Sequence, residues 1–190
     1  MFFELVLKSR SFRRFDQSVR MGKETLIDLV NLARLAPSPS NLQGLKFCLF
    51  ADEADCEQVF SCVKFAGYLK DWSGPKEGEK PSGYMIILGD KTIKPTFEID
   101  AGIAAQTMLL GAAEKGFGGC MMKSFDQEKL REFLGIGENL EIVLVIALGK
   151  PAETVVIEDY DPAHGIEYYR DEQGIHHVPK RGLDELIINS

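Results

Sequence analysis

The chain has 190 residues, of which 45% are hydrophobic and 27% charged, so it can bury a core and does not have the composition of a disordered segment. Its formal net charge of −7 argues against a nucleic-acid-binding surface. The opening segment MFFELVLKSRSFRR is not predicted to be a signal peptide, because its apolar run is short and its basic cluster follows that run. No apolar stretch approaches the ~20 residues that a membrane span needs. We therefore expect a cytoplasmic protein without a membrane segment.

The four cysteines and three histidines give no indication of a metal site or a disulfide. No C-x-x-C pair is present, and three histidines are few for completing a metal site. Cys56 shares helical spacing with Val59, Phe60 and Val63, which predicts a small core residue. Reduced thiols agree with a cytoplasmic protein.

The first half of the chain predicts helices over residues 2–9, 24–36 and 52–67 and strands over 45–51 and 84–90. Pro37 ends the second helix, and Asp52 caps the third. Residues 70–83 are rich in Gly, Pro and Lys and predict an exposed loop or lid.

The second half centres on a helix at 96–116 that is apolar on nearly all sides. Such a helix must be buried on nearly all sides, either by a second subunit or as the central helix of a monomer. A strand over 118–125, a capped surface helix over 126–135 and a strong strand over 141–151 follow. The polar, aromatic tail from about residue 152 predicts an extended arm that packs along another surface.

Helices and strands alternate, but their connections are too short for regular crossover units. This pattern predicts a single α+β domain over residues 1–190, with one mixed, largely antiparallel sheet flanked by helices.

Three segments carry candidate binding residues. Arg10, Ser11 and Arg13 follow the first helix, and two forked guanidiniums beside a hydroxyl are suited to bind an anion, although a solvated basic patch has the same spacing. Lys180 and Arg181 form a second basic pair with the same two interpretations. The glycines of GFGGC leave backbone N–H groups unshielded, so that a flat ligand can approach.

The loop APSPSNLQGLKF (36–47) carries more hydroxyls and amides than a turn needs, which indicates that its polar groups have something to hold.

No set of protein side chains is marked for catalysis. The chain has no G-x-S-x-G nucleophile elbow and no P-loop, and His164, His176 and His177 all lie in the arm, where a solvated or structural role is the default. A bound cofactor that performs the chemistry itself fits this combination.

These motifs, in this order, resemble the FMN-dependent nitroreductase family over nearly the whole chain. RSFRRF resembles the family's R-S-x-R element for the FMN phosphate and ribityl chain, and APSPSNLQ resembles its P-S-x-x-N-x-Q loop beside the flavin. GFGGC resembles the glycine turn beside flavin N5, and VPKRG resembles a phosphate-contacting basic pair. The cofactor-binding residues that the resemblance implies are Arg10, Ser11, Arg13, Pro37, Ser38, Asn41, Gln43, Gly118, Gly119, Lys180 and Arg181.

The resemblance implies an intertwined homodimer, with the arm of about 152–190 on the partner subunit and one FMN per chain. It also implies a ping-pong reaction that carries hydride from NAD(P)H through flavin N5 to a nitroaromatic or quinone. Two alternatives remain open: a non-catalytic protein that stores or senses flavin, and a specialised flavin reaction such as reductive dehalogenation.

The residues expected beside the electron acceptor differ from those of many family members. Many members have Pro-Trp where this chain has Gly44 and Leu45. Trp72 of the 70–83 region and Tyr68 just before it are the nearest aromatics that can line the acceptor side. The alternative for Trp72 is that it anchors its own loop.

Overall fold

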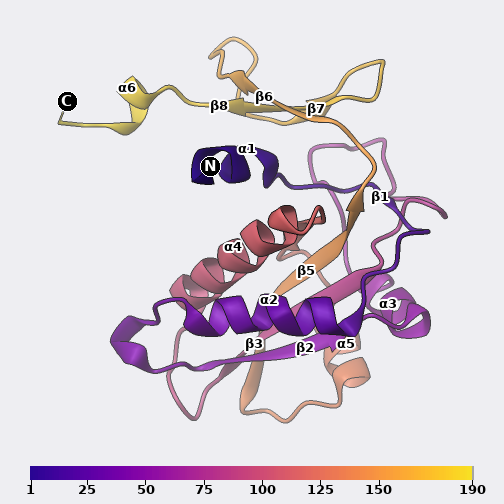
Figure 1. The fold of residues 1–190 in the computed structure, drawn as a ribbon, viewed down its shortest axis with the longest axis vertical. Coiled ribbons are helices and arrows are strands. Elements are labelled where there is room, and N and C mark those ends of the chain that lie inside the picture. Colours follow the sequence, from indigo (N-terminus) through magenta and orange to yellow (C-terminus); the bar gives the residue numbers. More distant parts are fainter. Residues whose placement is uncertain (190) are drawn as a thin grey trace.

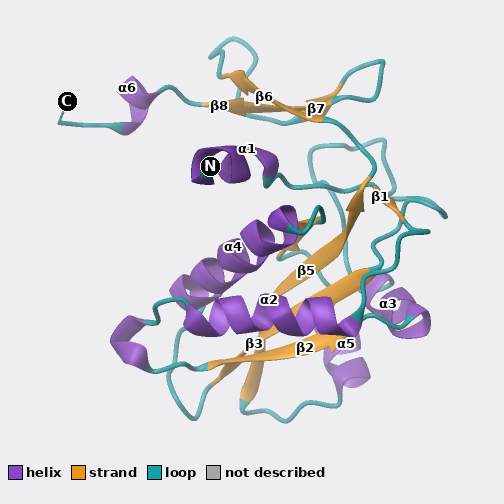
Figure 2. Ribbon diagram, viewed as in Figure 1, coloured by secondary structure: helices purple, strands orange, loops and turns teal. Residues whose placement is uncertain are grey.

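The computed structural model describes residues 1–189. Figures 1 and 2 show a central sheet with helices on both faces and a smaller sheet beyond it, formed by the end of the chain. The helices are α1 Phe2–Lys8, α2 Lys23–Leu35, α3 Glu53–Phe60, α4 Glu98–Glu114, α5 Gln127–Leu134 and α6 Leu183–Leu186, with a short 3-10 turn at Pro39–Asn41. The strands are β1 Phe15–Asp16, β2 Leu45–Phe50, β3 Gly83–Asp90, β4 Gly118–Met122, β5 Leu140–Pro151, β6 Val155–Asp159, β7 Tyr169–Arg170 and β8 His176–Lys180.

The five-stranded sheet is built around β5, and every pair in it is antiparallel. The order is β1-β5-β3-β2, and β4 also pairs with β5. In the register, Ile86 lies opposite both Cys48 of β2 and Val145 of β5. The predicted α+β fold with a largely antiparallel sheet is confirmed.

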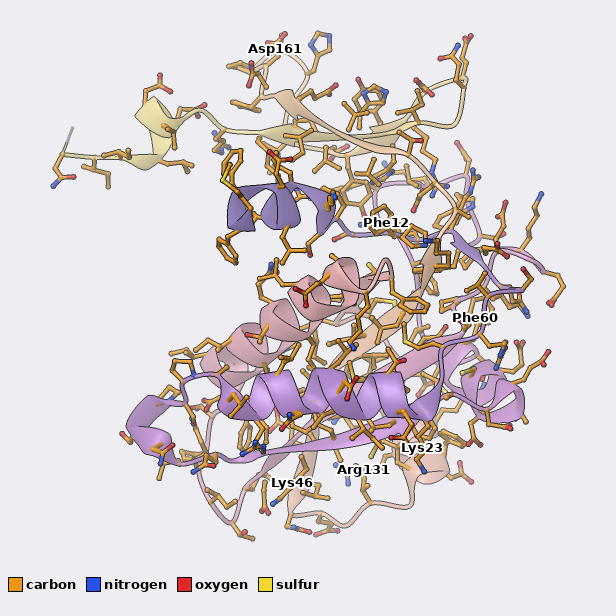
Figure 3. All side chains as sticks on the ribbon, in the orientation of Figure 1. Phe12, Lys23, Lys46, Phe60, Arg131 and Asp161 are labelled. Atoms are coloured by element: carbon orange, nitrogen blue, oxygen red, sulfur yellow. The ribbon has the colours of Figure 1, made fainter. Side chains whose placement is uncertain are left out.

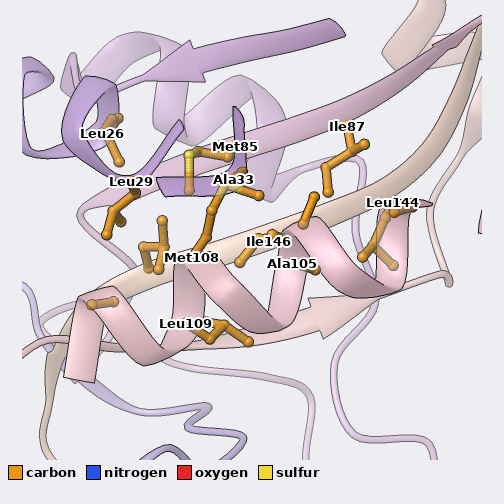
Figure 4. Close-up of a cluster of buried hydrophobic side chains, with 14 of the residues drawn as sticks. Leu26, Leu29, Ala33, Met85, Ile87, Ala105, Met108, Leu109, Leu144 and Ile146 are labelled. Carbon is orange, nitrogen blue, oxygen red and sulfur yellow. The ribbon is translucent and has the colours of Figure 1, made fainter. Parts of the chain in front are cut away.

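Alternation along β3 divides the core into two layers. Met85 and Ile87 face one side, where they pack with Leu29 of α2 and Met108 of α4 (Figure 4). Tyr84, Ile86 and Leu88 face the other side, where Val59 of α3 and Leu130 of α5 complete a second cluster. The sheet is therefore covered by α2 and α4 on one face and by α3 and α5 on the other.

One predicted helix boundary needs correction, and one predicted burial is incomplete in a single chain. The third helix ends at Phe60 rather than at residue 67, because the chain beyond it pairs with the segment before α5: Lys64 N–H donates to Ser124 O (2.9 Å), and Asp126 N–H donates to Cys62 O (2.7 Å). The predicted burial of the 96–116 helix on nearly all sides is not reached in one chain, since Ile99 remains 68% exposed.

The arm is more ordered than the sequence predicts. Its strands form a sheet in the order β6-β8-β7, in which β6 and β8 run parallel. This sheet contributes to neither hydrophobic cluster of the body. In Figure 1 it lies beyond α1, and α6 projects past the body at its far end.

Across the described residues, no helix combines the length and the apolar character that crossing a bilayer requires. Cys56, Cys62 and Cys120 are buried free thiols, and Cys56 packs in the second cluster as predicted. Residues 70–82 contain no helix or strand.

Candidate functional site

The segment between α1 and β1 runs along the glycine strand β4. Ser11 forms a parallel bridge with Gly119, and Phe12 N–H donates to Gly119 O at 3.0 Å. A Cβ on Gly118 would collide with the Phe12 ring, and one on Gly119 would collide with Ala147 O of β5. Figure 3 labels Phe12 at this junction. The two glycines are therefore required where three backbone segments pack closely, and this packing places Ser11 beside β4.

Arg10 is half-buried and its charge is not compensated. One Nη donates to Val6 O at 2.6 Å, and its buried Nε has no hydrogen-bond partner. Burial lowers the pKa of Arg10. Within residues 1–189, no carboxylate lies within ion-pair distance of this guanidinium.

Arg13 is only 8% exposed, and the groups that contact its guanidinium are uncharged. Its Nη1 donates to Ser11 O (3.3 Å) and lies 3.0 Å from Nε2 of His176, while its guanidinium carbon lies 4.3 Å above the Tyr168 ring. Burial, reinforced by the charge of Arg13, lowers the pKa of His176 to about 4. Because a guanidinium can only donate, the neutral His176 accepts this hydrogen bond through Nε2.

Glu153 joins the base of the arm to the N-terminal segment. Its Oε1 accepts hydrogen bonds from the backbone N–H groups of Arg13 and Arg14, the latter at 3.0 Å. Its Oε2 pairs with Arg170 at 2.8 Å, and the two side chains are 1% and 10% exposed. The first part of the arm is thus fixed to its own chain.

The loop after α2 holds a conformation that costs free energy. Ser40, Asn41 and Gln43 have φ angles of 53°, 55° and 52°, in the left-handed region that favours glycine. Such residues cost about 1 kcal/mol or more each and concentrate at functional sites. The strained backbone is therefore consistent with a loop that is shaped to bind a ligand.

Buried polar contacts hold this loop in place. The Ser38 hydroxyl donates to Asp100 Oδ1 (2.6 Å) and accepts from the Gln43 N–H (3.1 Å), while Lys94 Nζ lies 2.5 Å from Asp100 Oδ2. Burial opposes ionisation of Asp100, but the hydrogen bonds from Lys94 and Ser38 outweigh it and lower the pKa of this carboxyl. A Cβ on Gly44 would lie 2.9 Å from the Lys94 side chain, which would have to shift to accommodate it.

The same loop borders a mainly apolar cavity of about 290 Å³ between α2, α4 and β2. Of the predicted loop residues, Pro37, Ser38 and Gln43 line this cavity, whereas Asn41 is exposed and lies outside the lining. Figure 1 places the loop at one end of α2 and the N-terminal segment near the other end. One chain therefore does not bring the two predicted halves of the site together.

The second basic pair lies at the end of the arm sheet. Lys180 is exposed, and no ion pair of it is formed within residues 1–189. Arg181 pairs with Glu185 at 2.7 Å and lies 4.5 Å above the Tyr160 ring.

The two aromatics predicted for the acceptor side contact the arm. The Trp72 ring lies 4.2 Å from the guanidinium carbon of Arg170, and the Tyr68 ring centroid lies 4.9 Å from that of Tyr168. These contacts hold Tyr68 and Trp72 against the arm residues Tyr168 and Arg170, while Tyr68 stays 48% exposed.

Sequence reasoning gave His176 only a default solvated or structural role, and it missed Tyr168, Glu153 and Arg170. Nothing in their local pattern marks them, because their proximity to Arg13 depends on how the arm returns over the N-terminal segment.

Comparison with solved structures defines the fold class. A nitroreductase family protein from Clostridium novyi NT is 22% identical with a TM-score of 0.64, covering 80% of this chain and 86% of its own. A structure named FMN-dependent nitroreductase, from Clostridium difficile R20291, is 22% identical with a TM-score of 0.64 over 85% and 93%. The fold is that of nitroreductase-type oxidoreductases.

The chain belongs to the nitroreductase family, whose model matches residues 6–73 and 78–150. YodC of Bacillus subtilis is 27% identical over 176 residues, covering 76% of this chain and 87% of YodC. The NADPH-flavin oxidoreductase of Vibrio harveyi is 23% identical over 201 residues, covering 97% and 80%. As a member of this family, the chain is a flavin-dependent oxidoreductase.

Proposed function

We propose that this protein is an FMN-dependent oxidoreductase that passes hydride from NAD(P)H to an electron-poor acceptor by a ping-pong mechanism. The observation that carries the proposal is the pair of a half-buried Arg10 and a nearly buried Arg13, whose guanidiniums pair with no carboxylate within residues 1–189. A buried cation without a counter-charge is costly, so an anionic ligand is the natural partner. The names of the Vibrio harveyi relative and of the Clostridium difficile structure support a flavin, FMN and a nicotinamide donor.

The donor set fits FMN. Arg10 and Ser11 would hold the phosphate, joined by Lys180 and Arg181, and Arg13 would face the pyrimidine side of the ring. The backbone at Gly118 and Gly119 would lie beside the reactive edge. When bound, FMN supplies the hydride-accepting N5, so the protein's part is to bind, orient and exclude water.

The site is proposed to be shared in a homodimer. The 36–44 loop and the N-terminal segment lie near opposite ends of α2, so a two-fold partner would bring the loop of one subunit to the flavin of the other. Exposed apolar side chains support a large interface, and they occur on α1, around the loop, at the start of α4 and at the end of the arm. Examples are Phe2 (71% exposed), Leu35 (66%), Ile99 (68%) and Leu183 (73%). The arm of about 152–190, whose base and middle contact their own chain, would complete this interface on the partner through its end.

The proposed acceptor is a nitroaromatic or a quinone, which must stack on the exposed flavin face. Gly44 and Leu45 leave that side without the bulk of Pro-Trp, and Trp72 and Tyr68 would be its aromatic wall.

The decisive experiment identifies and then reduces the ligand. We expect one FMN per chain by mass after heat release, reduction of the bound flavin by NADH or NADPH without oxygen, and reoxidation by a quinone. Recovery of FAD, or no flavin after reconstitution, would overturn the cofactor. Bound FMN that neither nicotinamide reduces would favour the non-catalytic alternative.

A further inference from the structure

The charges around Arg13 are arranged in an unusual way. A nearly buried arginine ordinarily pairs with a carboxylate, and Glu153 is close enough to contact the Arg13 backbone N–H. The Glu153 carboxylate nevertheless forms its ion pair with Arg170, whose Nη2 lies 2.8 Å from Glu153 Oε2, and both side chains are nearly buried. Arg170 therefore neutralises the one acid beside Arg13.

The groups on the Arg13 side chain itself are all uncharged. They are the Ser11 carbonyl, the Tyr168 ring face and His176 Nε2. His176 is fully buried and is held on β8, which pairs with β6 and β7, so its ring has a defined position. The hydrogen-bond direction requires the neutral imidazole, and burial together with Arg13 and Arg170 lowers the pKa of His176 so that it stays neutral at working pH, against the opposing effect of Glu153.

We propose that His176 is a positioning residue, which orients the Arg13 guanidinium as a neutral acceptor and leaves its positive charge uncompensated for the bound flavin. A carboxylate in this place would orient Arg13 equally well but would cancel the charge that favours the anionic reduced flavin. The inference rests on the proposed function, in which Arg13 faces the flavin pyrimidine. It assigns a role in the redox properties of the site to a histidine of the arm.

The test is the two-electron midpoint potential of bound flavin in a set of variants, measured together with affinity for oxidised FMN. His176→Gln keeps a neutral acceptor and should stay close to the wild type. His176→Glu adds a charge against Arg13 and should lower the potential by at least about 30 mV, which is a tenfold loss of preference for reduced flavin. His164→Glu is the matched control, because it adds the same charge on the arm at a side chain that is 83% exposed. It should leave the potential unchanged.

Arg13→Gln separates this inference from the proposed function. If Arg13→Gln leaves the potential unchanged, the placement of Arg13 beside the flavin is wrong. If Arg13→Gln lowers the potential and His176→Glu does not, the role of His176 is overturned. Should His176→Glu fail to fold, His176→Leu, which removes the acceptor, must lower the potential below that of His176→Gln. Equal potentials in the Leu and Gln variants would overturn the inference as well.

Discussion

Glu153→Gln is expected to destabilise the protein strongly through the charge that it leaves behind. The Gln amide oxygen can still accept from the backbone N–H groups of Arg13 and Arg14, so the shape and two hydrogen bonds are kept. Arg170, whose side chain is 10% exposed, then loses its only carboxylate among the described residues. Breaking a buried pair by removing one partner costs about 3–5 kcal/mol, a large fraction of the roughly 5–15 kcal/mol that holds a domain together.

The matched control is Glu185→Gln, which removes an acid from the arm pair Arg181–Glu185. That pair is 44% and 40% exposed, so its loss should cost at most about 1 kcal/mol. Denaturant unfolding of both variants, with limited proteolysis to detect release of the arm, measures the difference. Arg170→Met in the Glu153→Gln background should recover part of the loss, because it removes the unpaired charge. Equal unfolding free energies for the Glu153 and Glu185 variants would refute the reasoning.

Three further predictions follow from the site, the arm and the exposed apolar faces. Arg10→Ala should weaken FMN binding roughly 10- to 150-fold, the equivalent of about 1.5–3 kcal/mol for a charge-assisted contact, measured by fluorescence titration; unchanged affinity would place the phosphate elsewhere. His177 is held between Asp171 and Glu158, whose hydrogen bonds raise its pKa, so its contribution to stability is complete below the unfolded value near 6.5 and is lost as pH rises through the folded pKa. His176, with its pKa lowered to about 4, acts in the opposite sense and costs stability as pH falls from about 6.5 towards 4. Thermal unfolding across pH should therefore flatten on the alkaline side in His177→Gln and on the acid side in His176→Gln, and identical profiles would contradict both assignments. Finally, light scattering should report the mass of a dimer, whose interface we expect to exceed ~2,000 Å² in a structure of the assembly, and Ile99→Asp should shift the mass towards that of a monomer without changing the fold; a wild-type chain that is monomeric at micromolar concentration would exclude the shared site.

The sequence was sufficient for the elements whose signals are local. Continuous apolar runs located β3 and β5, Pro37 marked the end of α2, and Asp52 marked the start of α3, where its carboxylate accepts from the Ala54 N–H at 3.0 Å. The end of α3 was not predictable in this way. It depends on backbone pairing with Ser124 and Asp126, which lie about 60 residues further along the chain.

The residues of the candidate site also divide into those with a local sequence signal and those without one. Arg10, Ser11, Arg13 and the 36–44 loop were visible because motifs carry them, and the strain at Ser40, Asn41 and Gln43 agrees with a loop built for a ligand. The groups that determine the charge around Arg13 belong to no motif. Their roles arise from the three-stranded sheet of the arm, whose weak local signals predicted only an extended tail.

The arm would link the proposed flavin site to dimer formation. Its base is held on its own chain by Glu153, and its middle section supplies His176 and Tyr168 to Arg13 of that same chain. Its end, from Leu183 to Ile188, has exposed apolar side chains and projects past the body. If that end is covered by a partner, as proposed, dimerisation restrains the strand that holds His176. Conditions that dissociate the dimer should then alter the flavin potential before they unfold the core, because α2, α4 and the central sheet pack without any residue of the arm.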